Sequence, residues 1–355
     1  MRLLFLSKRH PQQRDLLERP YGRFHHLPAT LAELGHDVTT LLCSHRRMGK
    51  QTVVREGVRW SSHDLLNHGP RRLVADLTAE AEAFRPDWVV GCSDAWFGWL
   101  AQVLAQRTGA RLAVDAYDNY EAYMRWNVPL HWKWRRSVRA ADLVTAAGPQ
   151  LAELLQTHRR GGRRVELLPM AADPGFVPMD RMACRSSLGL PDAAPLIGYS
   201  GGWAGNRGTH VLLDSFQRVR AVQPDARLVL SGRPPAEVCA APGVIALGYL
   251  DDAQLPVLLN ALDVACVITA DTLFGRYSYP AKLCEAMACG VPVVATATKP
   301  VCWMLGHDAR SLAAVGDADD IAARLLSRLG EGRVDYGTLP TWKYNGQRLE
   351  ALLSD

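Results

Sequence analysis

The sequence predicts an α/β protein with doubly wound parallel sheets in two domains. Three observations lead to this prediction. Short buried strands alternate with amphipathic helices along the first half of the chain, which is typical of parallel sheets. In the second half, a glycine-rich loop at 201–208 separates a buried strand from a helix, and a helix, a glycine and a strand follow within 278–295. A length of 355 residues is enough for two domains of ordinary size.

The first half of the chain is expected to form one sheet with helices packed on it. Strands are predicted where short apolar runs lie between turn residues, and helices where apolar residues recur at helical spacing. The predicted helices are 24–34, 73–84, 96–106 and 150–156. The predicted strands are 3–7, 38–43, 88–92, 111–116, 143–147 and 165–168, with an edge hairpin at 53–60.

The second half repeats this alternation after a polar segment at 179–194, which we interpret as a linker. The predicted helices are 209–222, 255–262, 318–329 and 342–353. The predicted strands are 196–200, 227–232, 244–247, 264–268 and 291–295.

The segment 278–295 carries the clearest functional pattern. It reads Ser-Tyr-Pro-Ala-Lys-Leu-Cys-Glu-Ala-Met-Ala-Cys-Gly-Val-Pro-Val-Val-Ala, with Lys282 near the start of a helix and Glu285 one turn later. Gly290 stands where a helix C-cap belongs, because glycine adopts positive φ without steric cost. Ligands of open α/β sheets bind at the carboxyl ends of strands, against helix N-termini. An ammonium group there suits phosphate oxygens, and a carboxylate suits a ribose diol.

This segment resembles the nucleotide-sugar signature of retaining glycosyltransferases of family 4, which have the GT-B fold. The family pattern is Glu, seven residues, Glu and then Ala-Met-Ala-x-Gly-x-Pro-Val-Val-Ala, and its second half matches from Glu285 onward. By this resemblance, Glu285 hydrogen-bonds the ribose of the donor nucleotide. The chain departs from the pattern at Tyr277, which replaces the first Glu, a residue that usually lies near the donor sugar and its phosphate.

The GT-B resemblance implies two Rossmann-like domains that face each other across a cleft. We expect an acceptor-binding domain at 1–178 and a nucleotide-sugar-binding domain at 195–335, joined by the linker 179–194. The remaining segment, 336–355, resembles the last GT-B helix, which crosses back to the first domain.

The glycine-rich loop 201–208 is expected to approach the donor diphosphate with its backbone N–H groups. The resemblance places Arg207 at the position of a diphosphate-binding Lys, whereas an Arg of the family is missing near Gly202 or Trp203. A surface loop for Arg207 and an ordinary turn for Gly22 are the alternatives. The expected donor contacts are, for the diphosphate, Gly202, Arg207, Lys282 and Gly22, and, for the base, Tyr249 or Leu250.

A polar run follows the predicted strand 111–116. Members of the family often carry a His-Asp pair here, and this chain has Tyr117 and Asp118, with Asp115 three residues before Asp118. An Asp at a strand end can orient a sugar hydroxyl or accept a proton. We therefore take Asp118, Tyr117 and Asp115 as candidate catalytic residues, with a helix N-cap as the alternative role of each Asp.

The segment 123–139 interleaves tryptophans with cations. Tryptophan favours membrane interfaces, and clustered cations attract anionic headgroups by about 1 kcal/mol each. A core-packing helix with a basic face and an RNA-binding surface are the alternatives, but the doubly wound pattern offers no platform for RNA, so we expect no nucleic-acid partner. The residues proposed for a membrane or acceptor patch are Trp126, Trp132, Trp134, Arg135 and Arg136.

Composition restricts the remaining possibilities. The net charge of +5 permits contact with phosphates or an anionic membrane and does not demand nucleic acid. Eight scattered cysteines without a Cys-x-x-Cys pair or metal-spaced histidines indicate free thiols in a reducing compartment and no metal site. No apolar run reaches transmembrane length, and the opening apolar run is too short for a signal peptide. We expect a protein of the cytoplasm or of the cytosolic face of the inner membrane.

The resemblance thus implies a hexosyltransferase that moves a sugar from a UDP- or GDP-linked donor to a hydroxyl acceptor without a metal cofactor. A lipid-linked or polysaccharide intermediate is the expected acceptor, and retention of configuration follows from the resemblance. Inversion stays open, because the first Glu and the His are both replaced. Two alternatives are a GT-B nucleotide-sugar epimerase, which needs no acceptor, and a catalytically inactive nucleotide-binding GT-B protein.

Overall fold

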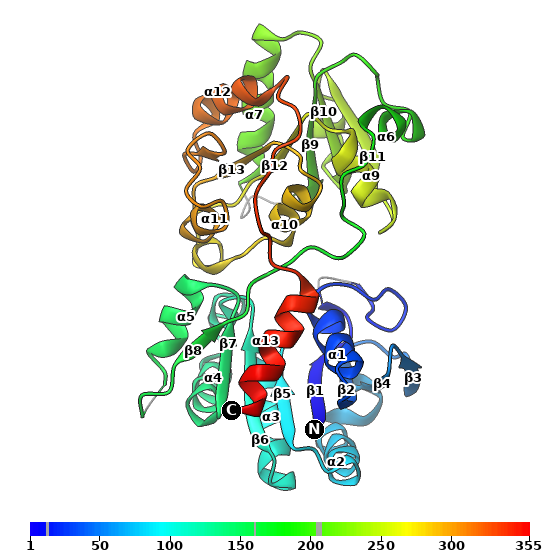
Figure 1. Cartoon of the computed structure of the whole chain (residues 1–355), viewed down its shortest axis with the longest axis vertical. Helices are drawn as coiled ribbons and strands as arrows, with labels where there is room; N and C mark the ends of the chain where they lie inside the picture. Colours follow the sequence, from blue (N-terminus) through cyan, green and yellow to red (C-terminus); the bar gives the residue numbers. More distant parts are fainter. Residues whose placement is uncertain (12–13, 160, 204–207) are drawn as a thin grey trace. The chain divides into compact units, whose positions relative to one another are not determined.

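The computed structural model describes residues 1–11, 14–159, 161–203 and 208–355. The chain divides into two compact units, which we call the first and the second unit. The first unit comprises Met1–Met170 and Pro340–Asp355, and the second comprises Ala171–Leu339. Each unit is built on its own sheet with helices packed against it (Figure 1), so the predicted α/β class is confirmed.

The first unit contains the strands β1 (Arg2–Lys8), β2 (Asp37–Ser44), β3 (Gln51–Arg55), β4 (Val58–Asp64), β5 (Trp88–Gly91), β6 (Arg111–Ala116), β7 (Leu143–Ala146) and β8 (Val165–Leu167). Across the sheet they follow the order β3-β4-β2-β1-β5-β6-β7-β8. Every pair is parallel except β3 and β4, which form the predicted edge hairpin. The carboxyl ends of β1, β5 and β6 therefore meet at one edge of the sheet.

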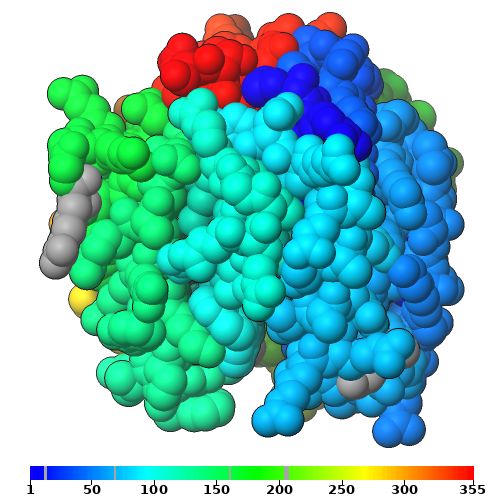
Figure 2. Space-filling model, turned by 90° about the horizontal axis from the view of Figure 1, so that it is seen from below, coloured from blue at the N-terminus to red at the C-terminus, as the bar shows by residue number. Residues whose placement is uncertain are grey.

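The helices of the first unit include a C-terminal helix that returns to its N-terminal part. Trp88 Nε1 donates a hydrogen bond of 3.0 Å to the carbonyl oxygen of Leu353, and a Cβ atom on Gly346 would collide with Thr30. Figure 2 shows these C-terminal residues, in red, beside the dark blue start of the chain. The helices are α1 (Arg23–Glu33), α2 (Leu65–Phe84), α3 (Ala95–Thr108), α4 (Val128–Ala140), α5 (Pro149–Gln156) and α13 (Trp342–Ser354).

The second unit contains a fully parallel sheet with β9 (Leu196–Gly201) near its centre. The other strands are β10 (Arg227–Gly232), β11 (Val244–Gly248), β12 (Val264–Val267), β13 (Val293–Thr296) and β14 (Leu312–Ala313), and the order is β11-β10-β9-β12-β13-β14. Because all these strands are parallel, the loops that follow β9, β11 and β12 lie at the same edge of the sheet.

Helices cover both faces of the second sheet, as a doubly wound sheet requires. One apolar core contains residues of α6 (Arg181–Ser187), α9 (Gln254–Ala261) and α10 (Ala281–Ala288). The other core contains residues of α7 (Thr209–Val222), α8 (Ala236–Cys239) and α12 (Ala318–Arg328). A short helix, α11 (Lys299–Met304), follows β13. The bounds of α7 and β10 coincide with those predicted from the sequence.

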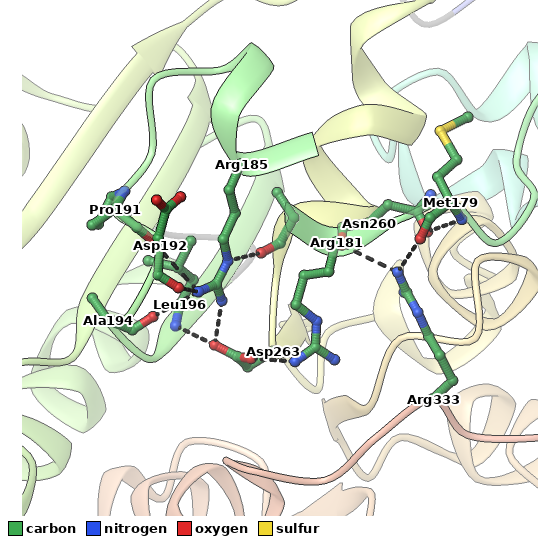
Figure 3. A network of polar contacts seen from close by, with 11 residues as sticks. Met179, Arg181, Arg185, Pro191, Asp192, Ala194, Leu196, Asn260, Asp263 and Arg333 are labelled. Atoms are coloured by element: carbon green, nitrogen blue, oxygen red, sulfur yellow. Dashed lines mark hydrogen bonds and ion pairs between the residues drawn. The ribbon is translucent and has the colours of Figure 1, made fainter. Parts of the chain in front are cut away.

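The polar segment 179–194 is folded onto the second unit and contains α6, a helix that the sequence pattern did not predict. Asp263, directly before β12, is buried and accepts hydrogen bonds from Arg181 (2.6 Å), from Arg185 (2.7 Å) and from the backbone N–H of Leu196 (2.7 Å). Figure 3 shows this network. One carboxylate thereby fixes both α6 and the start of β9 to the residue directly before β12.

A second part of the network joins the two segments that enter and leave the second unit. The backbone N–H of Met179 donates to Asn260 Oδ1 over 2.8 Å. The Arg333 guanidinium donates to the carbonyl oxygens of Met179 (2.9 Å) and Asn260 (3.2 Å), as Figure 3 shows. The chain near 179 and the chain near 333 are therefore fixed to the same end of α9.

Candidate functional site

The signature segment places Lys282 across the end of the central strand of the second unit. Lys282 lies in the first turn of α10 and is half-buried. Its Nζ atom donates a hydrogen bond to the carbonyl oxygen of Ser200, at the end of β9, and lies 5.6 Å from the centre of the Tyr199 ring. A cation is therefore held at the carboxyl edge of the sheet.

Glu285 lies one turn further along α10 and is only 7% exposed. Together with Lys282 it lines a small pocket whose other walls include Gly198, Ser200 and Val267. Most of the pocket is apolar, so the two charged side chains are its distinguishing feature. A hydrogen bond to a carboxylate is stronger in such a low-dielectric setting than in water. The pocket therefore combines a cation suited to phosphate with a carboxylate suited to hydroxyl groups.

Glycines make room for this arrangement. A Cβ atom on Gly201 would collide with Lys282 Nζ, and the residue has φ +152°, a conformation that other residues rarely adopt. At Gly232, the last residue of β10, a Cβ atom would lie 2.5 Å from the Gly201 carbonyl oxygen. The two strand ends thus approach each other and the ammonium group more closely than side chains would allow.

The expected diphosphate loop is described only in part. Gly202 is exposed, and its carbonyl oxygen accepts a hydrogen bond of 3.0 Å from Tyr199 Oη. Arg207 lies outside the described residues, so its predicted contact with the diphosphate stays a prediction. The described chain resumes at Gly208, which has φ +76° and directly precedes α7. Gly202 and Lys282 therefore both lie at the carboxyl end of β9.

The two residues predicted to meet the nucleotide base differ in exposure. Tyr249 follows β11 and is 60% exposed, whereas Leu250 is 8% exposed and packs into the core beside α9. The Leu250 side chain is therefore a core residue, and only the backbone of this position is available to a ligand. Tyr249 lies at the same edge of the parallel sheet as Lys282.

The cysteines beside Glu285 are structural in character. Burial raises the pKa of the Cys284 thiol to about 12, and the charge of Glu285 adds to this effect. Burial likewise raises the pKa of Cys289 to about 12. Both thiols stay protonated near neutral pH, which makes them poor nucleophiles. All eight cysteines are free, in agreement with the expectation from the sequence.

In the first unit, Asp115 forms a buried ion pair with Arg23. The Arg23 guanidinium donates to Asp115 Oδ2 over 2.6 Å and to Oδ1 over 2.5 Å, and Thr145 Oγ1 donates to Oδ1 over 2.5 Å. Arg23 and Asp115 are 2% and 3% exposed. Although burial opposes the charge of Arg23, Asp115 raises the pKa of the guanidinium above its ordinary value. This geometry makes Asp115 a fixed structural partner and leaves it poorly suited to proton transfer.

Asp118 occupies a different setting, in the turn after β6. It is 6% exposed and accepts a hydrogen bond of 2.7 Å from Tyr123 Oη. The helix-cap alternative does not apply to it, because Asn119 caps the next helical turn by accepting from the backbone N–H of Glu121. Asp118 is thus the better placed of the two candidate carboxylates to receive a hydroxyl group.

Tyr117 links this turn to the start of α1. Its ring packs edge-on against Phe24, with centroids 5.2 Å apart, and burial, together with the charges of Asp118 and Asp94, raises the pKa of its hydroxyl well above the ordinary value. The phenol therefore stays protonated and can donate a hydrogen bond. Gly22, directly before α1, has φ +63° and accepts hydrogen bonds from the backbone of the first helical turn. The loop that ends at Gly22 and the carboxyl end of β6 therefore lie close together in the first unit.

Several polar residues at this edge were not predicted from the sequence. Lys8, at the end of β1, pairs with Asp94 over 2.9 Å, and its backbone N–H donates to Ser93 Oγ over 2.9 Å. Ser93 has φ +76°, an uncommon conformation for a residue other than glycine. Their position after strands β1 and β5 is the signal that would have found them, because sites gather at such strand ends.

The basic aromatic segment is divided by α4 into two faces. Trp126 and Trp132 are 79% and 60% exposed, whereas Trp134 is 2% exposed and packs against Tyr120 with ring centroids 4.9 Å apart. The prediction that Trp134 belongs to a surface patch is therefore wrong. Arg135 is exposed but forms a two-pronged ion pair with Glu121, so its charge is locally balanced.

In the part of the chain that the structure describes, no three acidic, histidine or cysteine side chains gather as metal ligands. Among the same residues, the helices are each too short or too polar to cross a bilayer.

Comparisons with known proteins agree with this architecture. A family model described as glycosyl transferases group 1 matches residues 194–331, and a second, described as a glycosyl transferase 4-like domain, matches residues 22–171. Among solved structures, sucrose-phosphate synthase from Thermosynechococcus elongatus superposes with a TM-score of 0.72 at 18% identity, covering 99% of this chain and 95% of that chain. HepE from Anabaena in complex with UDP-glucose superposes with a TM-score of 0.69 at 15% identity, covering 99% and 94%. These likenesses confirm the GT-B fold.

Sequence relatives cover less of the chain. A D-inositol 3-phosphate glycosyltransferase of Stackebrandtia nassauensis is 28% identical over an alignment of 242 residues that covers 60% of this chain and 54% of that protein. A phosphatidyl-myo-inositol mannosyltransferase of Propionibacterium freudenreichii is 35% identical over an alignment of 147 residues that covers 39% of this chain and 36% of that protein. The chain thus spans about half the length of the first of these relatives and about a third of the second.

Proposed function

Because the chain belongs to the glycosyl transferases group 1, with a first domain of the glycosyl transferase 4-like type, we propose that it transfers a sugar from a nucleoside diphosphate sugar to an acceptor hydroxyl. The observation that carries this proposal is the position of Lys282 and Glu285 on one helix, in one pocket, at the carboxyl edge of the second sheet. One side chain suits the diphosphate, and the other suits the ribose.

The chemistry requires a diphosphate to leave the sugar with its negative charge. Groups that stabilise developing charge lower such a barrier most when they are fixed in advance. The Lys282 ammonium is already held at the end of β9, and the first backbone N–H groups of α10 add partial positive charge. We propose that these groups stabilise the leaving diphosphate and that Arg207 contributes a second cation. In this proposal no metal ion is required.

The donor is proposed to be a uridine or guanosine diphosphate sugar. HepE from Anabaena has been solved in complex with UDP-glucose, which supports a uridine donor in a protein of this fold. Glu285 would accept hydrogen bonds from the ribose, and Tyr249 with the backbone of Leu250 would contact the base. Tyr277 stands where the family has its first Glu, the residue that usually lies near the donor sugar. The contact with the donor sugar is therefore where we expect this chain to differ most from the family.

The acceptor is proposed to be a hydroxyl group of a lipid-linked or polysaccharide intermediate. The names of two relatives refer to D-inositol 3-phosphate and to phosphatidyl-myo-inositol, which supports an anionic, phosphate-bearing acceptor. Asp118 would orient or deprotonate the attacking hydroxyl, and the protonated Tyr117 would donate to a sugar oxygen. Retention of configuration is proposed from the family alone.

The test is nucleotide binding followed by a transfer assay. Thermal stability is measured with UDP, GDP, CDP, ADP and dTDP for the wild type, for Glu285→Ala, and for Glu237→Ala as an exposed control in the same unit. A ligand present at a hundred times its dissociation constant adds about 2.7 kcal/mol to stability. We expect one nucleotide to stabilise the wild type and the control but not Glu285→Ala.

The same protein then distinguishes the alternatives. Sugar transfer that needs an added acceptor supports the proposed reaction. Conversion of the donor sugar into an epimer without acceptor would instead identify the protein as an epimerase. Nucleotide binding without any turnover would identify it as an inactive nucleotide-binding protein. If no nucleotide stabilises the protein, the donor site proposed at Glu285 is wrong.

A further inference from the structure

The solvent-facing side of α4 and the turn before it carry large apolar side chains that the fold leaves uncovered. Tyr123 is 53% exposed, Trp126 79%, Val128 66% and Trp132 60%. We call these four residues, with the neighbouring Arg125 and Arg136, the α4 patch. Exposed apolar side chains that gather on one face of a protein mark an interaction site, whereas single scattered ones do not.

The helix itself shows that the exposure is not a side effect of poor packing. Leu130, Trp134 and Val138, spaced four residues apart, are all buried. A Cβ atom on Gly98 of α3 would lie 2.6 Å from the Trp134 ring, so α3 and α4 pack tightly at this point. The core-facing side of α4 is thus already satisfied. Val128, Trp132 and Arg136, also four residues apart, form the opposite side.

Cations lie over two tryptophan rings of α3 and α4, one exposed and one partly buried. The Arg136 guanidinium lies 5.6 Å from the centre of the Trp132 ring, and Lys133 Nζ lies 3.7 Å from the Trp99 ring of α3. Between 123 and 139 the sequence contains five Lys or Arg residues and no Asp or Glu. The nearby Glu121 is engaged with Arg135. The partner that fits must accept aromatic rings and carry negative charge.

We propose that the α4 patch docks onto the surface of a bilayer that contains anionic phospholipids. Indole and phenol rings favour the interface between headgroups and acyl chains, and the exposed Val128 adds an aliphatic contact that a nucleic acid would not use. The cations attract the headgroups, and this attraction decays within a Debye length. A single helix with a short turn also lacks the aromatic platform on which proteins stack single-stranded RNA.

The patch is continuous with the candidate acceptor site. Tyr123 is exposed on the patch and also donates its hydroxyl hydrogen to Asp118. Docking would therefore bring headgroups beside the carboxylate that is proposed to receive the acceptor hydroxyl. This second step rests on the proposed function, whereas binding to the membrane does not.

The experiment is flotation of the whole chain with vesicles of phosphatidylcholine alone or of phosphatidylcholine with 30 mol% phosphatidylglycerol, roughly the anionic surface that polybasic segments recognise. We expect binding to the anionic vesicles at low salt, binding at least about tenfold weaker to the neutral ones, and loss at about 1 M salt, where the Debye length is about 3 Å. The Trp fluorescence should shift to the blue on binding, because exposed indoles enter a less polar medium.

Two variant pairs locate the contact. Trp126→Ala with Trp132→Ala should reduce partitioning about tenfold or more, and Arg125→Gln with Arg136→Gln should remove much of the preference for anionic lipid. Tyr344→Ala, at a residue 57% exposed on α13, and Arg71→Gln, at an exposed residue of α2, serve as matched controls and should bind as the wild type does. Nucleotide-induced thermal stabilisation should be unchanged in all of them, so failure of the donor site and failure of docking are distinguishable.

Several outcomes would overturn the proposal. Equal binding of wild type and the tryptophan pair would show that another surface contacts the lipid. Absence of flotation with anionic vesicles at low salt would exclude bilayer docking. Binding to single-stranded RNA that depends on Trp126 and Trp132, without binding to vesicles, would assign the patch to nucleic acid instead.

Discussion

The Lys282 ammonium group donates a hydrogen bond to the carbonyl oxygen of Ser200, which joins the first turn of α10 to the end of β9 across 82 positions of sequence. A lysine on an open surface would spread its charge over many rotamers. Here the cation is confined to the carboxyl edge of the sheet before any ligand binds. Such fixed charge needs little reorganisation when a leaving group develops negative charge.

Replacing Lys282 by alanine should therefore reduce sugar transfer more than it reduces stability. We expect kcat to fall about 100-fold, the range found when one charge-stabilising donor is removed, while the unfolding midpoint in urea changes little. Lys343→Ala, at an exposed lysine of α13, is the control and should leave both quantities unchanged. An unaltered kcat in Lys282→Ala would remove the residue from the proposed chemistry.

Gly201→Ala tests the space that the ammonium group occupies. The added Cβ atom would displace Lys282 Nζ and would also strain a backbone with φ +152°. We expect nucleotide affinity, measured by isothermal titration calorimetry, to fall about tenfold. This corresponds to the loss of one charge-assisted contact worth about 1.4 kcal/mol. Gly316→Ala separates the two effects, because Gly316 has φ +80°, while among the described residues none beyond its chain neighbours has an atom within 4 Å of the added Cβ. Equal affinities in both variants would argue against a role for this close approach.

Glu80 of α2 provides a pH-dependent contribution to the stability of the first unit. Burial opposes its charge, but hydrogen bonds from His63 and Lys50 outweigh burial and lower the pKa of Glu80 to about 2. A carboxylate whose pKa is lowered in the folded state stabilises the fold above its ordinary pKa, and this contribution is lost as the pH falls toward the folded value. The loss should thus occur between about pH 4.5 and pH 2.

Urea unfolding of Glu80→Gln at two pH values measures this contribution. At pH 7 the variant should be less stable than the wild type by about 1–2 kcal/mol, and at pH 3.5 the difference should be smaller. Glu82→Gln, at an exposed residue two positions along the same helix, should show little difference at either pH. A difference between wild type and Glu80→Gln that grows at low pH would contradict the assignment.

Hydrophobic periodicity and turn residues predicted those helices and strands whose ends depend on neighbouring residues in the sequence. Gly290 was expected to end a helix with positive φ, and it has φ +67° directly after α10 and its cap. The helix 209–222 lies between a glycine loop and a turn with proline, and both of its ends were predicted correctly. Periodicity and turn residues are sufficient signals for such elements.

The features that escaped prediction depend on partners distant in sequence. The helix α6 has only seven residues, and its arginines made the segment look like a polar linker. Their partner, Asp263, lies 78 positions after Arg185, so no local pattern indicated it. Asp115 was a candidate to accept a proton or orient a hydroxyl, and only the structure shows that Arg23, 92 positions away, binds its carboxylate. Trp134 is different, because its spacing of four from Leu130 and Val138 was a local signal for the buried side of α4. Attention to that period would have removed it from the predicted patch.

The contrast between Asp115 and Asp118 leads to opposite predictions for the same substitution. Asp115→Asn removes the charge that balances the buried Arg23, and an uncompensated buried charge costs about 3–5 kcal/mol. Asp118→Asn keeps a side chain of the same size that can still bond Tyr123 Oη. We therefore expect Asp115→Asn to unfold at clearly lower urea concentration, and Asp118→Asn to unfold within about 1 kcal/mol of the wild type.

Activity should follow the reverse order. If Asp118 accepts the proton of the attacking hydroxyl, Asp118→Asn should lower kcat by 10²–10⁴-fold, roughly the contribution of general base catalysis, while nucleotide binding by calorimetry is unchanged. Asp115→Asn should keep near-normal kcat per folded molecule when assayed below its unfolding temperature. Full activity of Asp118→Asn would show that Asp118 is not the general base. An activity loss in Asp115→Asn without a loss of stability would assign a catalytic role to Asp115, because the buried ion pair with Arg23 would then not explain its presence.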